Sequence, residues 1–390
     1  MEMSKECHRS HDDFITEFEK SIPVPSTSKD AFFPEIGPEK EHRIGFAYST
    51  LNERMLFYHT PGVSLAYIQD YEIKWARGFG IEKVGSEREV TQTTIFEAAS
   101  TTKFLNALLI LRLVEQGYLS LTEDVNSYLS SWKIPDNEFT RLHPVTLMTL
   151  LTHTAGLPPT NFNWKEGTRP TLLDVLKGQF PAINASVEVR YTPGTRYEYS
   201  NLSHIVIQFL LEEIFHNPYP EIMNDKIFRP LHMTHSYFPD QNRTGPEDSV
   251  AFPHDREGKM HTPIHHPSAL AQGGLLTTPT DLAKVAIDIM CSYKGEPDRY
   301  LTQKSVFILF ENRGYLGDKM IGIPLYQGLG CFVHERGNDF MFTHPGYNIP
   351  GMLSYFYGYP KSGRGGVVMI NGENGEKLAY EIIQALNRLH

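Results

Sequence analysis

The chain of 390 residues is 40% hydrophobic and carries a formal net charge of −10 at pH 7. This size and composition allow a large buried core, in one big domain or in two smaller ones. The acidic balance and the lack of a basic block argue against nucleic acids and anionic membrane surfaces as partners.

Several features bear on cellular location. The opening stretch MEMSKECHRSHDDFITEFEK has neither an apolar core of signal-peptide length nor a small-residue cleavage site. The longest apolar stretch, Phe104 to Val114, is interrupted by Asn106 and Arg112 and is too short to span a bilayer. The cysteines lie far apart and form no C-x-x-C pair, which favours a reducing compartment. We therefore expect a cytoplasmic protein without a membrane span.

Residues 1–42 are expected to form an N-terminal arm, and residues 43–390 a single domain. Apolar residues recur at helical spacing from Phe14 through Phe18 to Ile22, which predicts a short amphipathic helix over 11–22. The prolines and charges of PVPSTSKDAFFPEIGPEKEH then interrupt regular structure.

Strand patterns occur near both ends of the chain. In GVSLAYIQDYEIKWARGFG (62–80), Val63, Leu65 and Tyr67 alternate, and a turn near Asp70 predicts a hairpin. Strand-like runs return late, in YQGLGCFVHE, DFMFTHPG, GMLSYFYGYP and GVVMING. We expect residues 62–80 and roughly 326–371 to form one antiparallel sheet, with the closing helix, 377–389, on one face.

Helical patterns dominate the middle of the chain. The stretch FEAASTTKFLNALLILRLVEQG, which begins at Phe96, is apolar almost all round and predicts a core helix. Further helices are expected over 202–215 and 278–290, the latter with Thr280 as N-cap before Asp281. The fold class is therefore α+β, an α/β sandwich whose sheet part spans about 43–98 and 320–390, with a mostly helical insertion over about 99–319.

Ser100 and Lys103 lie at the start of the apolar helix, three residues apart and so on one helical face. A serine hydroxyl is a poor nucleophile unless a base takes its proton. A lysine serves as that base only when its amine is neutral, and burial at the start of this helix would favour the neutral form. The helix N-terminus also offers backbone N–H groups to a developing oxyanion.

An S-x-x-K spacing is weak evidence alone, because the chain holds two further examples. Ser26–Lys29 falls in the proline-rich arm, and Ser130–Lys133, in YLSSWKIP, is interpreted as a surface helix end. Neither has an apolar context that could neutralise its lysine.

The context of Ser100 resembles the serine β-lactamase and penicillin-binding-protein superfamily, in which S-x-x-K, Y-x-N and K-T-G or H-x-G boxes follow in this order. YEYSNLS supplies Tyr199 and Asn201, and FTHPGYNIPGM supplies His344, Pro345 and Gly346. The stretches PGVSLAYIQD, LMTLLTHTAGLPP, IFRPLHMTHSYF and AQGGLLTTPTDLA are also similar to the family. The resemblance covers about residues 60–390. Within the superfamily, the chain looks most like the branch that contains class C β-lactamases, D-alanyl-D-alanine carboxypeptidases and β-lactamase-like esterases.

The resemblance implies a β-lactamase/transpeptidase-like fold and a role for each matching residue. Ser100 would be the nucleophile that forms an acyl-enzyme, and Lys103 would activate it. Tyr199 would carry the proton to the leaving group, with a pKa lowered by Lys103. Asn201 would hold the acyl side chain or Lys103. The backbone N–H groups of Ser100 and Tyr347 would form the oxyanion hole.

The third box departs from the family pattern. His344 stands where the family lysine recognises a substrate carboxylate, and Pro345 replaces the usual hydroxyl residue before Gly346. Both changes weaken carboxylate recognition. They favour an ester or small amide without a free acid, in a substrate site that includes Asn201, His344, Gly346 and Tyr347.

Other interpretations of single residues remain open. Tyr199 could be a core tyrosine, Asn201 a helix N-cap and His344 a solvated loop histidine. His153 in LLTHTAG is interpreted as a structural hydrogen-bonding residue. His261 and His265 are four apart, but Pro263 between them prevents a metal-binding H-x-x-x-H helix. No cofactor or metal is expected.

The sequence therefore predicts a serine hydrolase that acts on a small-molecule ester or amide. A D-alanyl-D-alanine carboxypeptidase, a β-lactamase and an acyltransferase are alternatives of the same chemistry. The absence of G-x-S-x-G argues against an α/β-hydrolase. A non-catalytic ligand-binding descendant is the alternative of another class, although Lys103 and Tyr199 are both present. The oligomeric state stays open.

Overall fold

The structure is a computed structural model. It describes residues 11–24, 47–160, 162, 164–239, 249–263, 268–317 and 324–389. Most of the predicted arm lies outside these residues, as do Cys7, the Ser26–Lys29 pair, His265 and His266.

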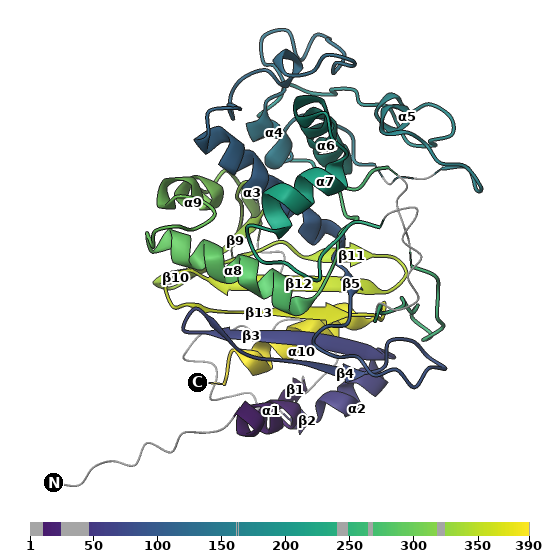
Figure 1. Cartoon of the computed structure of the whole chain (residues 1–390), viewed down its shortest axis with the longest axis vertical. Helices are drawn as coiled ribbons and strands as arrows, with labels where there is room; N and C mark the ends of the chain where they lie inside the picture. Colours follow the sequence, from purple (N-terminus) through teal and green to yellow (C-terminus); the bar gives the residue numbers. More distant parts are fainter. Residues whose placement is uncertain are drawn as a thin grey trace, which may run out of the picture.

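A nine-stranded sheet forms the centre of the described chain (Figure 1). Its order is β4-β3-β13-β12-β10-β9-β8-β7, with β11 paired to β12, and every pairing is antiparallel. The strands are β3 (Gly62–Gln69), β4 (Glu72–Gly80), β7 (Tyr315–Gly317), β8 (Leu325–Gln327), β9 (Phe332–Arg336), β10 (Asp339–Thr343), β11 (Gly346–Asn348), β12 (Met352–Tyr359) and β13 (Arg364–Ile370). The predicted single antiparallel sheet from both ends of the chain is confirmed.

The sheet is covered on both faces, so its central strands are buried throughout. Along β3, Val63, Leu65 and Tyr67 enter one hydrophobic cluster, and Ala66 and Ile68 enter the other. This is the alternation expected of a strand, whose successive side chains point to opposite faces. Helix α10 (Gly375–Leu386) packs on β12 and β13, and α8 (Pro279–Tyr293) packs on β3, β12 and β13. The predicted C-terminal helix on the sheet is confirmed.

The N-terminal segment is packed against this core. Helix α1 (His11–Glu19) buries Phe18 against Trp75, with ring centroids 5.5 Å apart. Strand β1 (Ile22–Val24) then pairs with β2 (Ala47–Ser49). The helix predicted to run to Ile22 therefore ends at Glu19. Because Ile22 precedes a proline, the extended conformation is favoured there over the helical one.

The helical part stands on one side of the sheet (Figure 1). Its elements are β5 (Phe96–Glu97), α3 (Thr102–Glu115), η2 (Val125–Ser127), α4 (Leu147–Leu151), α5 (Leu172–Lys177), α6 (Asn201–Phe215), α7 (Tyr219–Met223), η3 (Asn224–Phe228), β6 (Leu276–Thr277) and α9 (Gln303–Phe310). The predicted insertion over about 99–319 differs from the structure in two ways. It includes the short strand β7, which belongs to the sheet, and it includes helix α8, which packs on the sheet.

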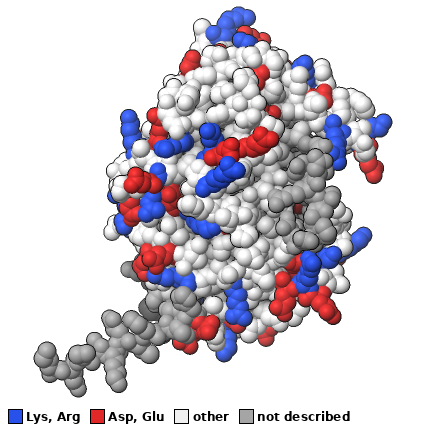
Figure 2. All heavy atoms as spheres, in the orientation of Figure 1, with Lys and Arg blue, Asp and Glu red and all other residues white. Residues whose placement is uncertain are grey.

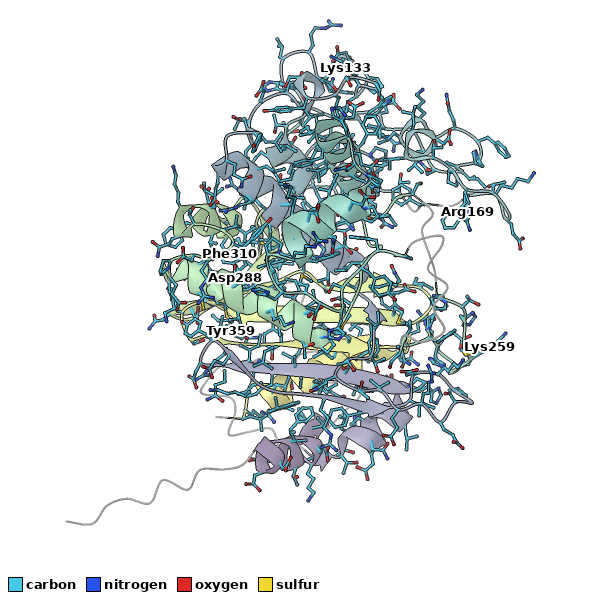
Figure 3. The ribbon with its side chains drawn as sticks, in the orientation of Figure 1. Lys133, Arg169, Lys259, Asp288, Phe310 and Tyr359 are labelled. Atoms are coloured by element: carbon cyan, nitrogen blue, oxygen red, sulfur yellow. The ribbon has the colours of Figure 1, made fainter. Side chains whose placement is uncertain are left out.

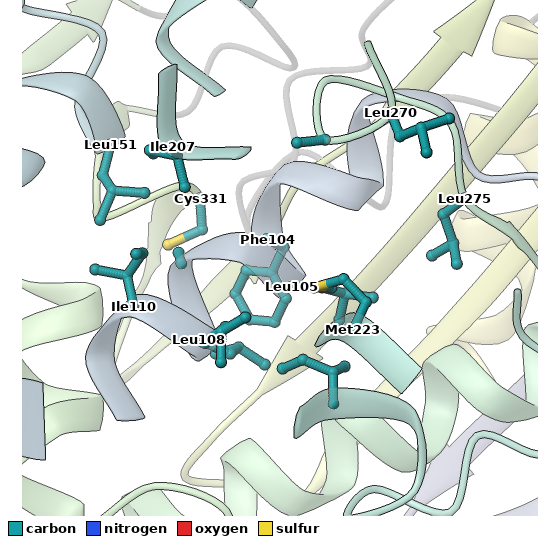
Figure 4. Close-up of a cluster of buried hydrophobic side chains, with 14 of the residues drawn as sticks. Phe104, Leu105, Leu108, Ile110, Leu151, Ile207, Met223, Leu270, Leu275 and Cys331 are labelled. Atoms are coloured by element: carbon teal, nitrogen blue, oxygen red, sulfur yellow. The ribbon is translucent and has the colours of Figure 1, made fainter. Parts of the chain in front are cut away.

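Helix α3 runs through the larger hydrophobic cluster (Figure 4). Phe104 packs on Phe356 of β12 with ring centroids 4.8 Å apart, and Leu151 and Ile207 bring α4 and α6 to the same cluster. Surrounded on all sides, α3 needs apolar residues around its whole circumference. The prediction that it is a core helix is confirmed.

Helix α8 begins two residues earlier than its predicted cap implies. Thr278, not Thr280, is the N-cap: its backbone is extended and its hydroxyl accepts from the Asp281 N–H at 3.3 Å. Pro279 occupies the first helical position, where its missing N–H costs nothing.

Both signs of charge are scattered over the face drawn in Figure 2. Among the described residues, no helix combines the length and hydropathy needed to cross a bilayer.

A buried ion pair ties α2 (Leu51–Phe57) to α10, and we expect its disruption to destabilise the fold. Arg54 Nη2 lies 2.7 Å from Glu381 Oε1, and Arg54 Nε lies 2.9 Å from Glu381 Oε2. Glu381→Leu leaves the guanidinium buried without its carboxylate, which should lower the free energy of unfolding by about 3 kcal/mol. Urea titration measures this loss.

The matched control is the exposed pair of Arg229 and Asp225, whose atoms lie 3.0 Å apart. Asp225→Leu should change stability by less than ~1 kcal/mol because both charges remain in water. Equal losses in the two variants would contradict a structural role for burial of the Arg54–Glu381 pair.

Candidate active site

Ser100 lies where the chain passes from β5 into α3. The single turn η1 (Ala99–Thr101) precedes the helix, and the Ala98 N–H donates to the Leu275 carbonyl at 2.8 Å. Ala99 has φ +46°, a left-handed conformation that L-residues rarely adopt. The turn therefore presents Ser100, which is partly exposed, above a helix whose next residues are buried.

Two side chains meet at the Ser100 hydroxyl. Lys103 Nζ lies 2.9 Å from Ser100 Oγ. The Tyr199 hydroxyl, brought from the residues before α6, donates to the same Oγ at 3.0 Å. Because the serine oxygen accepts the hydrogen bond from Tyr199, the serine's own proton remains available for donation to the lysine. The adjacency predicted from helical spacing is present, and the predicted tyrosine joins it.

Lys103 is completely buried, with no exposed surface. Burial lowers its pKa well below the ordinary value, because the interior disfavours the ammonium form. Its amine also donates to the Gln272 carbonyl oxygen. A neutral amine has two protons and one lone pair, so a proton donated to Gln272 leaves the lone pair available for the Ser100 hydroxyl proton. The sequence alone gives no indication of this contact with Gln272.

The pKa of Tyr199 differs from the prediction. Burial raises it to about 12, and the hydrogen bond to Ser100 opposes this shift. A lowered pKa would require a charged lysine beside the phenol. Because desolvation favours the neutral amine of Lys103, that cation is lost, and Tyr199 is a neutral phenol that donates a proton.

Among the described residues Asn201 has no hydrogen bond to Lys103, and its contact with an acyl side chain stays a prediction. It is the first residue of α6, and its Nδ2 donates to the Thr160 carbonyl at 3.2 Å. Its buried Oδ1 has no hydrogen-bond partner among the described residues. The N-cap of α6 is Ser200, which makes no side-chain cap bond, so the capping alternative for Asn201 is wrong. Lys103 contacts Gln272 instead of Asn201.

Gly346 lies against the nucleophile turn. A Cβ at this position would stand 2.0 Å from the Ala98 carbonyl oxygen and 3.0 Å from the Ser100 nitrogen, so only glycine permits the approach of β11. The next amide along the chain belongs to Tyr347, one residue after the glycine that lies against the Ser100 turn. The Tyr347 hydroxyl donates to the Glu373 carbonyl at 3.3 Å.

His344 follows β10 and is almost fully buried. Burial lowers its pKa to about 3, so the imidazole is neutral at neutral pH. Its Nδ1 lies 3.1 Å from the Pro345 carbonyl oxygen, which can only accept, and this assigns the proton to Nδ1. The ring packs on Phe332 with centroids 5.2 Å apart. The alternative of a solvated loop histidine is wrong.

His153 lies behind Tyr199. The Ser200 N–H donates to His153 Nδ1 at 3.3 Å. The centroids of the His153 and Tyr199 rings lie 4.3 Å apart. Burial lowers the pKa of His153 well below its ordinary value. The interpretation of His153 as a structural hydrogen-bonding residue agrees with these contacts.

The Ser130–Lys133 pair has no such surroundings. Ser130 is exposed and its hydroxyl donates to Glu213 at 3.2 Å. Lys133 lies at the outer end of the helical part (Figure 3). The segment is a bend held by Glu213 and not the predicted helix end. A serine already bonded to a carboxylate, with its lysine exposed, lacks the buried surroundings of Ser100.

No cluster of metal-ligating side chains occurs within the described ranges. His261 Nε2 lies 2.7 Å from Asp255 Oδ2, so this histidine forms a pair with a carboxylate near the surface.

The model of the family described as "Beta-lactamase" matches residues 49–388. Protein flp of Staphylococcus aureus (strain MRSA252) is 28% identical over 196 residues, which cover 50% of this chain and 38% of that protein. Unguisins hydrolase ungD' of Aspergillus campestris (strain IBT 28561) is 26% identical over 264 residues, covering 62% of this chain and 45% of that protein. The chain thus spans less than half the length of these curated relatives.

Solved structures share the fold. The octameric penicillin-binding protein homologue from Pyrococcus abyssi has a TM-score of 0.71 at 25% identity, over 87% of this chain and 75% of that chain. The D-amino acid amidase from Ochrobactrum anthropi SV3, in complex with L-phenylalanine, has a TM-score of 0.68 at 21% identity, over 86% of this chain and 98% of that chain.

Proposed function

Because the chain belongs to the beta-lactamase family, we propose that it is a serine hydrolase that forms an acyl-enzyme with esters or other small acyl compounds. One observation carries the proposal: the Ser100 hydroxyl lies 2.9 Å from the Lys103 amine and 3.0 Å from the Tyr199 hydroxyl. In this proposal, residues 43–390 form the catalytic domain and residues 1–42 an arm.

Acylation begins with a proton transfer. The Lys103 lone pair takes the proton of the Ser100 hydroxyl, and the serine oxygen attacks the substrate carbonyl carbon. The carbonyl π-bond opens to an oxyanion that the amides of Ser100 and Tyr347 stabilise. The Ser100–Gly346 approach supports this location for the hole.

Collapse of the tetrahedral intermediate breaks the bond to the leaving group. Tyr199 donates its proton to the leaving oxygen or nitrogen and receives the proton held by Lys103, so both groups regain their starting forms. The raised pKa of Tyr199 supports a role as neutral donor. Water, or an alcohol in a transferase, then repeats the sequence on the acyl-enzyme. No metal or cofactor takes part.

Short-chain esters are expected to be turned over faster than penicillins or D-alanyl-D-alanine peptides. The reason is His344, which is neutral and buried where the family lysine would meet a substrate carboxylate. A substrate carboxylate would then lose its solvation without gaining a cation. The measurement compares kcat/KM for p-nitrophenyl acetate, benzylpenicillin and a D-alanyl-D-alanine peptide. Efficient penicillin hydrolysis without esterase activity would contradict this preference.

The alternatives differ in substrate or acceptor. A carboxypeptidase or β-lactamase would use the same three side chains, and an acyltransferase would differ only in passing the acyl group to an alcohol. A ligand-binding descendant without catalysis would form no covalent adduct. Asn201 Oδ1, buried and without a partner among the described residues, is a further candidate for substrate binding.

Intact-mass spectrometry tests the proposal directly. The folded chain is incubated with a fluorophosphonate, p-nitrophenyl esters, cephalosporins and D-alanyl peptides in turn. A single adduct, mapped to Ser100, supports a serine hydrolase, and the compounds that form it report the substrate class. If none of these compounds forms an adduct, the proposal is contradicted and the non-catalytic alternative remains.

A further inference from the structure

The segment from Ser268 to Leu275 supplies the Gln272 carbonyl that contacts Lys103. This segment is not part of the sheet or of a helix, so its position depends on contacts with its neighbours. Its apolar residues Leu270 and Leu275 enter the cluster around α3 (Figure 4). Apolar packing holds the segment in place but does not orient a particular carbonyl.

Gln208 of α6 binds three backbone groups of this segment. Its Oε1 accepts from the N–H groups of Leu270 and Ala271 at 2.9 and 3.0 Å. Its Nε2 donates to the Ser268 carbonyl at 2.8 Å and to Glu212 Oε1 at 3.0 Å. The buried amide thus uses both acceptor positions and both donor protons.

Asn106 of α3 binds the next backbone group along. Its Nδ2 donates to the Ala271 carbonyl at 2.8 Å, and its Oδ1 accepts from the Tyr219 hydroxyl. Asn106 lies three residues after Lys103 and so on the same face of the helix. It has no exposed surface.

We infer that Gln208 and Asn106 form an amide clamp, a pair of positioning residues that aim the Gln272 carbonyl at the Lys103 amine. The two amides bind four backbone groups of the segment: the C=O of Ser268, the N–H of Leu270, and the N–H and C=O of Ala271. The following carbonyl is that of Gln272, so its direction is set one peptide away from the clamp.

The clamp acts on chemistry through Lys103, and its role rests on the proposed function. With one amine proton held by Gln272, the lone pair stays directed at Ser100. The segment also contacts the amine directly, and Lys103 has no exposed surface. Burial is the only cause of the lowered pKa of Lys103, so admitting water would raise that pKa toward its ordinary value.

The other titratable groups around Lys103 do not supply a compensating charge at neutral pH. They are Tyr199 ahead of α6, His204 on α6, His153 after α4 and His344 after β10. Burial lowers the pKa of each histidine and raises that of the tyrosine, so all four are neutral. A change in the acid limb of the pH–rate profile therefore reports the Lys103 amine.

The test measures acylation of the full chain by p-nitrophenyl acetate across a series of pH values. Gln208→Met removes all four hydrogen bonds of the amide while keeping the side-chain volume. The acylation rate at neutral pH should fall by at least ~10-fold. The acid limb should move to higher pH by about one unit, because a better-solvated Lys103 holds its proton more tightly.

Asn184→Leu is the matched control. This amide is also buried and donates to the Val175 and Ala185 carbonyls, far along the chain from the 268–275 segment. It should lower the melting temperature but leave the acid limb in place. An equal shift in both variants would show a general effect of lost buried amides and would overturn the clamp.

A double variant tests whether Gln208 acts through Lys103. In a Lys103→Ala background, Gln208→Met should cause no further loss of acylation rate, because the group it positions is gone. Additive losses would overturn the inference. If the Gln208→Met chain does not fold, Asn106→Ala replaces it: a smaller shift of the acid limb in the same direction is expected, and an unmoved limb contradicts the clamp.

The outcome for the wild-type chain separates the two proposals. A wild-type chain that forms no acyl-enzyme would overturn the proposed function. A wild-type chain that does so, with an acid limb that Gln208→Met and Asn106→Ala both leave in place, would overturn the clamp alone.

Discussion

Ser100→Ala is expected to remove covalent labelling completely. In the proposed mechanism, Ser100 Oγ is the atom that carries the acyl group, and the alanine methyl cannot replace it. Lys103 and Tyr199 both contact this atom in the structure, so the substitution also removes their shared partner. The measurement is intact-mass spectrometry after incubation with a fluorophosphonate, together with the burst of p-nitrophenol from an activated ester.

Ser130→Ala is the matched control within the same chain. It removes a serine that also precedes a lysine by three residues but donates to Glu213 on the surface. Labelling should be unchanged, because no buried neutral base lies beside Ser130. The same result is expected for Ser26→Ala, which lies outside the described residues. Loss of labelling in either control, or its survival in Ser100→Ala, would identify a different nucleophile.

The contact between Ser100 and Lys103 follows from sequence because it is local. Residues three apart on a helix are neighbours, and an apolar helix predicts burial of the lysine. Tyr199 is ninety-nine residues from Ser100, and its contact follows only from the resemblance to a family with an ordered set of boxes. The sheet could be predicted because strand patterns at both ends of the chain had no other partner of comparable length.

The Gln272 contact could not be predicted. It joins residues 169 positions apart through a backbone carbonyl, a group that every residue possesses. The conformation of the 268–275 segment, which aims that carbonyl, depends on side chains from two helices. The sequence does contain one signal, a polar Asn106 in the middle of an apolar helix, which marks a buried hydrogen-bonding partner.

The errors at helix ends have local causes. Thr278 and Thr280 are both suitable caps by residue type, and Pro279 between them is the signal that favours Thr278, because proline is preferred at the first helical position. Pro23 likewise marks the extended conformation of Ile22. The wrong prediction for the pKa of Tyr199 is an error of another kind, because the direction of that shift depends on whether a neighbouring amine is charged.

Lys103→Arg is expected to slow acylation nearly as much as Lys103→Ala, by at least ~10²-fold, the usual range for loss of a positioned base. An arginine keeps a positive charge and a long side chain but does not release its proton near neutral pH, so it cannot accept the proton of Ser100. The structure strengthens this expectation. Lys103 has no exposed surface and burial lowers its pKa well below the ordinary value, as a general base requires.

Tyr199→Phe should also slow acylation by at least ~10²-fold, because it removes the proton donor to the leaving group and keeps the ring that packs on His153. Combined with Lys103→Ala, it should cause less than the sum of the two losses, since both residues act on one proton path.

The acylation rates of the folded variants with one activated ester decide the role of the lysine. In the wild-type chain the rate should fall as pH drops through the pKa of Lys103, because protonation removes the lone pair that Ser100 needs. Tyr199→Phe should keep this acid limb, since it leaves the amine in place, whereas Lys103→Ala should lose it. Near-native rates in Lys103→Arg would show that a fixed cation suffices at this position. The buried amine would then serve structure alone, and the base for Ser100 would have to be sought in another residue.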